Sequence, residues 1–226
     1  MIGAIVSACY GDWDDIKALP AQDGAVLASA VMVTDNPDLI GRCPGWTVWV
    51  EPRPHMHPCL AAKVPKFRTD LYAPDVDYTV WVDASATIDR DFLAMCANSV
   101  APDAPEVPGL ATFPHPHRVS LYDEVACSRT LRKYDMLPLE AQVRHYIDQG
   151  YPDPCILRAS GCIVRRDPRS VWHKSFGDRW LQECVRWGFQ DQLSLSYLLW
   201  EEGMIPADIG PSLFTNDHIT FGPHRA

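Results

Sequence analysis

The sequence predicts an α/β fold in which a mixed, mostly parallel central sheet is flanked by helices. Apolar, β-branched runs alternate with segments of helical spacing along the 226 residues. The run 78–82 is apolar, β-branched or aromatic at every position, as in a strand buried on both faces. The chain has 226 residues, of which 47% are hydrophobic, and these are enough to form one full hydrophobic core. We therefore expect a single domain over residues 1–226.

Strands are expected where such runs are bounded by glycine, proline or acidic turn residues. They fall at residues 2–9, 26–34, 46–50, 78–82, 109–113, within 155–164 and at 205–209. Helices are expected at residues 59–72, as two short pieces interrupted at Pro65, and at 89–98, 119–134, 139–149, 169–187 and 191–202. Trp172, Phe176 and Trp180 recur at four-residue spacing, which favours a core stripe over a sugar platform.

Composition excludes several classes of function. The net charge of −9 disfavours broad binding to a nucleic-acid backbone, but it allows a local basic pocket. The chain has no glycine-rich dinucleotide loop after its first strand, no P-loop and no Gly-x-Ser-x-Gly elbow. Its eight cysteines are scattered singly, as expected for free thiols. The first residues lack a basic signal-peptide region and no run is long enough to cross a bilayer, so we expect a cytoplasmic protein.

Asp83 directly follows the buried strand, at the edge where open α/β sheets bind ligands. It is either an ordinary acid that ends a strand and begins a turn, or a carboxylate that holds a divalent cation against a diphosphate. Lys63 and Lys66 lie one helical turn apart upstream and would face the same way. They form either a solvated basic face or a binding site for that diphosphate.

Two histidines and an arginine follow the strand at 109–113. An extended backbone would point His115 and His117 the same way, where they could bind a metal, hydrogen-bond a sugar or transfer a proton. The guanidinium of Arg118 could bind a phosphate through two N–H groups, or it could pair with the acids at 123–124 on the next helix.

Further candidates lie later in the chain. Asp191 stands where a helix is expected to begin. It is either a capping acid or a carboxylate that points into the cleft and orients or deprotonates an acceptor hydroxyl. His218 and His224 lie in a polar tail from residue 211, and either could close over the cleft as a metal ligand.

Taken in order, these pieces resemble a glycosyltransferase-like family named after plant mucilage-related proteins, formerly a domain of unknown function. The similar segments are 8–14, 33–36, 46–48, 63–66, 78–85, 113–118, 122–124, 146–152, 161–165 and 191–200. The segment 78–85, Tyr-Thr-Val-Trp-Val-Asp-Ala-Ser, is similar to the family's strand ending in Trp-Ile-Asp followed by Ala or Gly. The resemblance covers roughly residues 2–200.

The resemblance implies a GT-A-like, Rossmann-like fold with a nucleotide-sugar donor, such as a UDP-sugar, and a divalent cation, Mn²⁺ or Mg²⁺. We expect the donor half at about residues 1–100 and the acceptor half at about 101–210. The Asp-x-Asp metal motif of such folds would fall on Asp83 and Ser85, so a serine replaces the second acid. One carboxylate would hold the cation more weakly than two.

The resemblance also implies roles for other residues. Asp12 and Asp35 fall where such folds contact the nucleoside, and Asp191 with Gln192 is similar to an acceptor-side motif at a helix start.

The sequence thus predicts a glycosyltransferase that moves a sugar from a nucleotide-diphosphate sugar to a hydroxyl of a saccharide, lipid-linked saccharide, protein or modified base. The expected site comprises Asp12, Asp35, Lys63, Lys66, Asp83, Ser85 and Arg118 for the donor, His115, His117 and Gln192 for the acceptor or sugar, Asp191 for catalysis, and Asp83 with His218 for metal. Two alternatives stay open. One is a GT-A-like protein that binds a glycan or nucleotide without turnover, and the other is a hydrolase using Asp83, His115 and His117 around a metal.

Overall fold

A computed structural model describes residues 1–11, 14–101, 109–155 and 157–222. Its central sheet has seven strands in the order β3-β2-β1-β4-β7-β6-β8. In that order the strands span Thr47–Val50, Val26–Thr34, Ile2–Cys9, Tyr78–Val82, Arg158–Arg166, Leu110–Pro114 and Ala207–Asp208. The first four run parallel, β7 runs antiparallel to both its neighbours, and β8 runs parallel to β6. The predicted fold class is therefore confirmed, and the expected donor and acceptor halves share one sheet.

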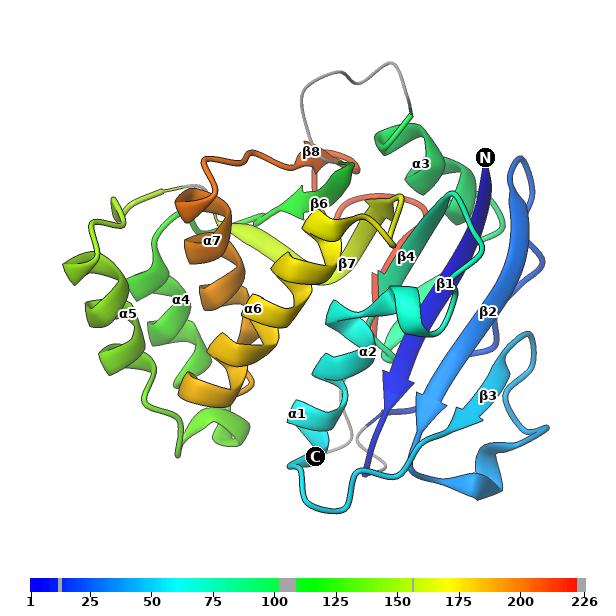
Figure 1. Ribbon diagram of the computed structural model, residues 1–226, viewed down its shortest axis with the longest axis horizontal. Coiled ribbons are helices and arrows are strands. Elements are labelled where there is room, and N and C mark those ends of the chain that lie inside the picture. The colour runs from blue at the N-terminus through cyan, green and yellow to red at the C-terminus, as the bar shows by residue number, and fades with distance from the viewer. Residues whose placement is uncertain (12–13, 102–108, 156, 223–226) are drawn as a thin grey trace.

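Helices cover both faces of this sheet (Figure 1). One face carries α1 (Pro58–Ala61), α2 (Lys63–Phe67), α6 (Val171–Trp187) and α7 (Asp191–Glu201), with α4 (Leu121–Ser128) and α5 (Leu139–Asp148) beside them. The other face carries α3 (Phe92–Ser99). Short 3-10 turns occur at Pro37–Leu39, Thr69–Leu71 and Arg132–Tyr134.

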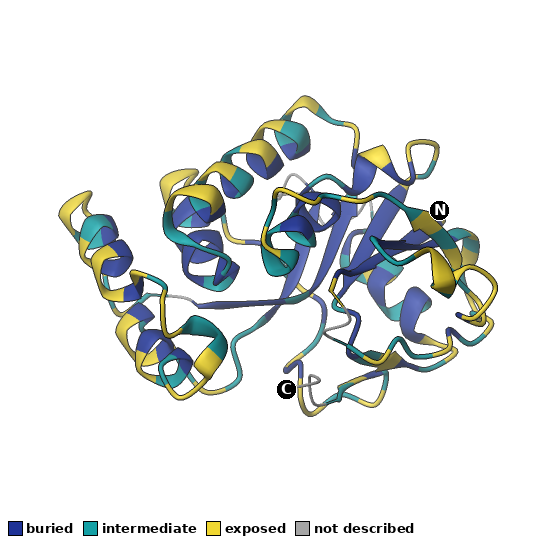
Figure 2. Cartoon of the chain, turned by 90° about the horizontal axis from the view of Figure 1, so that it is seen from below, coloured by how far each residue is buried: buried dark blue, intermediate teal, exposed yellow. Residues whose placement is uncertain are grey.

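Alternation along β4 divides the core into two layers. Trp81 faces the α2 and α6 side, where Phe67 and Trp180 stack with ring centroids 4.2 Å apart. Val80 packs on the other side, in the cluster that contains Phe92 of α3. Figure 2 shows the result, with buried strands at the centre and the helices turning their buried sides inward. The aromatic stripe predicted on α6 is thus confirmed as core.

Two predicted helices differ in the structure. The break in the segment 59–72 falls at Ala62, between α1 and α2, rather than at Pro65. Proline is tolerated there because it sits in the first turn of α2, where no backbone N–H has an intrahelical partner. The helix expected at 119–134 is shorter. Its α4 begins after Ser120, whose side chain accepts a hydrogen bond from the Tyr122 N–H, and it ends at Ser128, before the separate 3-10 turn Arg132–Tyr134.

The tail from residue 211 is more than a polar loop. Its β9 (Ile219–Phe221) pairs antiparallel with β5 (Ala86–Ile88), a strand that the sequence pattern missed. Leu213 and Ile219 are buried in the α3-side core. These apolar side chains attach the tail to the carboxyl edge of the sheet.

Two further predictions concern the cysteines and membrane-spanning helices. The eight cysteines all lie among the described residues and are thiols rather than disulfides, as predicted. Within the described ranges, no helix is both long and apolar enough to span a bilayer.

Candidate functional site

A cavity of about 370 Å³ opens at the edge of the sheet where the parallel strands β1 and β4 end. Its walls come from the segment after β1, α1 and α2, the end of β4, α4 and the turn after it, β7, the start of α7 and the tail. The polar and charged side chains in this wall are Tyr10, Asp14, Lys63, Lys66, Asp83, Ser85, Arg118, Glu124, Ser128, Lys133, Tyr134, Ser160, Gln190, Asp191 and Gln192.

Asp191 lies at the centre of a buried charge cluster in this wall. Its Oδ2 is 2.7 Å from Lys66 Nζ and 2.9 Å from Lys63 Nζ, and its Oδ1 accepts a hydrogen bond of 3.1 Å from Ser160 Oγ. The capping interpretation is wrong, because Gln190 is the N-cap residue and its side chain accepts from the Gln192 N–H. The Asp191 carboxylate is therefore free to hold the two lysines of α2.

The two lysines do lie on one side of α2, as their spacing predicts. Lys66 has a second acidic neighbour, Asp83, whose Oδ1 is 3.3 Å from Lys66 Nζ. The Lys66 side chain is only 1% exposed, so the interpretation as a solvated basic face is wrong. Charges thus alternate along the series Lys63, Asp191, Lys66, Asp83.

Burial and charge shift the titration of this cluster. Burial alone would raise the pKa of Asp191, but Lys63 and Lys66 outweigh it and hold that pKa well below its usual range. Burial opposes the charged form of Lys63, but the Asp191 and Asp83 carboxylates outweigh it and raise the pKa of Lys63. Asp191 and Lys63 are therefore both charged at neutral pH.

Asp83 is fixed at the end of β4 by its neighbours. Its backbone N–H donates to the Gly161 carbonyl on β7 at 3.0 Å, and Trp81 Nε1 donates to its Oδ1 at 2.8 Å. The Asp83 side chain remains 35% exposed in the cavity, whereas Ser85 is buried. Asp83 thus presents a partly open carboxylate with one oxygen already bound to a lysine and an indole.

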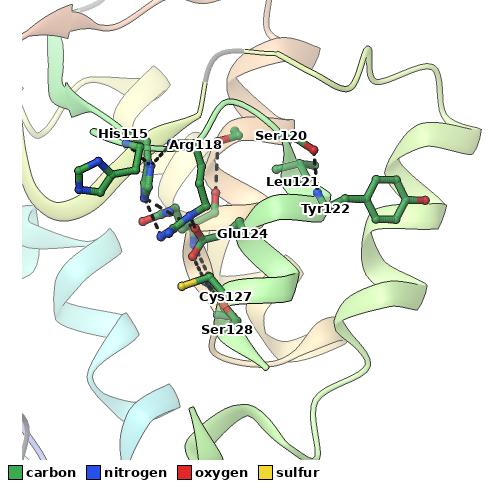
Figure 3. A network of polar contacts seen from close by, with 12 residues as sticks. His115, Arg118, Ser120, Leu121, Tyr122, Glu124, Cys127 and Ser128 are labelled. Atoms are coloured by element: carbon green, nitrogen blue, oxygen red, sulfur yellow. Dashed lines mark hydrogen bonds and ion pairs between the residues drawn. The ribbon is translucent and has the colours of Figure 1, made fainter. Parts of the chain in front are cut away.

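Arg118 points at Glu124 on α4, as Figure 3 shows. The Arg118 Nε donates to Glu124 Oε2 at 2.7 Å, and Gln190 Nε2 donates to Glu124 Oε1 at 2.9 Å and to Ser128 Oγ at 3.1 Å. Burial raises the pKa of Glu124, and its hydrogen bonds and charge pairing with Arg118 oppose that shift. The ion pair with the next helix, one of the two interpretations of Arg118, is present. The hydrogen bonds of Gln190 to Glu124 and Ser128 link α4 to the start of α7.

The histidine pair is arranged differently from the prediction. The segment bends around His115, whose Nδ1 accepts from the backbone N–H groups of His117 at 3.3 Å and Arg118 at 2.9 Å. These hydrogen bonds replace the extended backbone that was expected. The ring of His117 stacks on Phe214, which lines the cavity, whereas burial and the charges of Arg118 and His117 lower the pKa of His115 to about 4. Neither histidine is part of the cavity wall.

Four other predicted residues lie either apart from the cavity or outside the described residues. Asp35 Oδ1 accepts from the Gly11 N–H at 3.1 Å and so joins the loops after β1 and β2. His218 Nδ1 contacts Asp89 Oδ2 at 2.9 Å and lines a separate, shallow pocket beside α3, so the structure does not bring it to Asp83. Asp12 and His224 lie outside the described residues.

The described residues do not fit a divalent cation held by protein side chains alone. Among them, no three His, Cys, Asp or Glu side chains gather around one point. Asp83 supplies one carboxylate, and the ammonium of Lys66 already stands beside its Oδ1. Hard cations bind several oxygen ligands, and a neighbouring ammonium repels them. Among the described residues, Asp83, His115 and His117 likewise do not gather into the metal-binding group that a metal hydrolase would need.

Sequence reasoning missed several residues of the site. Glu124, Gln190, Ser160 and Lys133 all line the cavity. A Gln before a helix start is a weak capping signal, and the sequence indicates Glu124 only as a partner of Arg118. Ser160 on β7 and Lys133 in the turn after α4 carry no local signal, because only the tertiary fold brings them to Asp191 and Lys63.

Comparison with known protein families gives a match over most of the chain. The family model described as TOD1/MUCI70, glycosyltransferase-like domain, matches residues 23–215. That segment includes the lysines of α2, Asp83 and Asp191. A search of curated proteins finds no match.

Proposed function

The chain belongs to the TOD1/MUCI70 glycosyltransferase-like domain family. On that premise, we propose that it is a glycosyltransferase that transfers a sugar from a nucleotide-diphosphate sugar to a hydroxyl acceptor. The observation that carries the proposal is the charge series Lys63, Asp191, Lys66, Asp83 in a cavity at the carboxyl edge of the sheet.

This series suits a diphosphate leaving group. When the bond between sugar and phosphate breaks, negative charge develops on the nucleotide, and fixed positive groups in a partly dehydrated site stabilise it. Lys63 and Lys66 are fixed in this way, because Asp191 and Asp83 hold their ammonium groups at 2.7 to 3.3 Å. In this proposal, the positive charges of Lys63 and Lys66 therefore make the main electrostatic contribution to donor binding. The described side chains alone do not fit a divalent cation, and no step is assigned to one.

Asp191 has a positioning role in this proposal. A carboxylate whose pKa is held far below neutrality is a weak general base. It is nevertheless a strong hydrogen-bond acceptor, and it keeps both lysines facing the cavity. Gln192 lines the same wall, and its buried Nε2 has no hydrogen-bond partner among the described residues, which supports a role in binding a sugar hydroxyl.

The test is donor binding and turnover with a panel of UDP-, GDP- and other nucleotide sugars. Calorimetry should detect binding of at least one donor, and product analysis should detect slow hydrolysis or transfer to a simple saccharide. Lys66→Met should reduce donor affinity by about tenfold or more, the value of a lost charge-assisted contact. If no nucleotide sugar binds with or without Mn²⁺, the proposal fails.

A second function is favoured by one observation. Both oxygens of Asp191 are occupied, one by lysines and the other by Ser160, so the site lacks an obvious strong base. A protein that binds a nucleotide sugar or glycan without turnover would show the same geometry. Wild-type protein and Asp83→Asn separate the two functions. Binding without turnover in the wild type supports the binding protein, and turnover that falls in Asp83→Asn supports the enzyme.

A further inference from the structure

We propose that Lys133 is an anion-binding residue of this cavity and contacts the diphosphate of the donor. The inference rests on the proposed function and names a side chain outside the charge series described above. Lys133 belongs to the 3-10 turn Arg132–Tyr134 that follows α4, and it lines the same cavity as Lys63 and Lys66.

The basic side chains of the cavity differ in how they are neutralised. Four of them occur among the described lining residues. Lys63 and Lys66 are bound to Asp191, and Arg118 is bound to Glu124. Lys133 forms no ion pair with any carboxylate in the described part of the chain, and its ammonium lies 4.9 Å from the centroid of the Tyr134 ring. Lys133 therefore supplies positive charge that an incoming anion does not have to share.

In the absence of a ligand, the surroundings of Lys133 disfavour the charged form of its side chain. The side chain is half-buried, and burial together with the nearby charge of Lys63 lowers its pKa. Carboxylates of Asp14 and Asp83 act on it only from beyond ion-pair distance, and the neighbouring Cys59 stays a neutral thiol because burial raises its pKa. A phosphate placed between Lys133 and Lys63 would relieve the repulsion between the two ammonium groups.

The wall around Lys133 also suits this ligand. Tyr134 is held next to Lys133 by the same turn and lines the cavity. Phe189 lines the cavity beside Tyr134, with ring centroids 5.9 Å apart, and stacks on His57, with ring centroids 4.7 Å apart. A cation beside aromatic walls offers both charge and an apolar surface, which is the combination that a nucleoside diphosphate requires.

The chain provides a matched control in the same turn. Arg132 is exposed, is not part of the cavity wall, and carries the same charge one residue away. Lys133→Met and Arg132→Met therefore change the net charge equally but only the first removes a cavity cation. Lys133→Arg keeps the charge and serves as the conservative variant. Circular dichroism and urea unfolding verify that all three variants fold.

The experiment measures binding of UDP and of inorganic pyrophosphate to the full chain by calorimetry at about 0.15 M salt, where distant surface charges are screened. Lys133→Met should weaken both affinities by about tenfold to a hundredfold, the worth of one charge-assisted contact. Arg132→Met should change them by less than about threefold, and Lys133→Arg should retain most of the affinity.

Each outcome is decisive. Equal affinities in Lys133→Met and wild type overturn the assignment of Lys133 and leave the proposed function standing. Equal losses in Lys133→Met and Arg132→Met also overturn it, since the effect would then be one of net charge. Pyrophosphate binding that depends on Lys133, without binding or turnover of any nucleotide sugar, supports the anion site and refutes the proposed function. No binding of either probe to the wild type overturns both.

Discussion

Replacing Asp191 by Asn tests the charge cluster most directly. The change preserves shape but removes the negative charge that lies 2.7 Å from Lys66 and 2.9 Å from Lys63. Lys66 then keeps only Asp83, at 3.3 Å, and Lys63 keeps no carboxylate within ion-pair distance among the described residues. Of the two buried ammonium groups, Lys63 would be left unpaired within the described part of the chain, and Lys66 would keep a single, longer ion pair.

The expected loss of stability follows from these distances. At an effective dielectric constant of about 20, unit charges 2.7 Å apart attract by about 6 kcal/mol before the cost of dehydration is counted. Breaking a buried pair by removing one partner typically costs about 3–5 kcal/mol. Because Lys66 retains Asp83, we expect Asp191→Asn to lower the free energy of unfolding by about 3 kcal/mol at pH 7.

The pH dependence has a definite sign. The folded-state pKa of Asp191 is depressed, so the stability it contributes is present above the unfolded-state pKa of about 3.9 and is lost as pH falls toward the folded-state value. The difference in unfolding free energy between wild type and Asp191→Asn should therefore be constant from about pH 7 to 5 and shrink below about pH 4. Urea unfolding across this range measures it.

The control is Asp178→Asn, which makes the same chemical change at an ion pair with Arg68 where Asp178 is half exposed. Exposed pairs contribute little, so this variant should lose less than about 1 kcal/mol at any pH. Equal stabilities of Asp191→Asn and wild type at pH 7, or a deficit that stays the same below pH 4, would refute the reasoning.

Three further predictions follow from the packing and the site. Gly177→Ala on α6 should lower the free energy of unfolding by about 1–3 kcal/mol, because a Cβ there would lie 2.3 Å from the Phe67 carbonyl oxygen on α2. Urea unfolding measures this loss, and an unchanged midpoint would contradict it. Gln190→Ala should cost about 1–3 kcal/mol in the same assay, since it removes the cap of α7 and both hydrogen bonds to α4, and a loss below about 0.5 kcal/mol would show that the cap is unimportant. EDTA should change the affinity for UDP by less than about threefold, because lysines provide the cavity's positive charge, and a much larger loss in calorimetry would point to a bound cation.

Local patterns in the sequence predict part of this site. The apolar run of β4 places Asp83 at the carboxyl edge, because a buried strand and its end are both visible in a short window. The spacing of Lys63 and Lys66 predicts their common direction, because both lie on one helical turn. In each case the information lies within a few residues.

Other features depend on contacts between distant segments. Whether Asp191 caps its own helix or faces the cavity depends on Gln190 taking the cap and on Ser160 approaching from β7. The bend at His115 depends on backbone hydrogen bonds that the extended pattern does not indicate. Pairing of β5 with β9 joins segments more than a hundred residues apart, and each is too short to be recognised as a strand by its own pattern.

The position of Asp191 between two lysines connects donor binding to the chemistry proposed here. A diphosphate can reach Lys63 and Lys66 only by sharing them with Asp191 and Asp83, because these carboxylates already bind both ammonium groups. As the lysines turn partly toward phosphate, Asp191 loses neutralising charge and gains a negative neighbour, and both changes raise its pKa. A carboxylate that becomes more basic only when donor is present accepts a hydrogen bond from the acceptor hydroxyl more strongly at that stage. In the proposed glycosyltransferase, the same lysines would stabilise the leaving group and make the function of Asp191 depend on the donor.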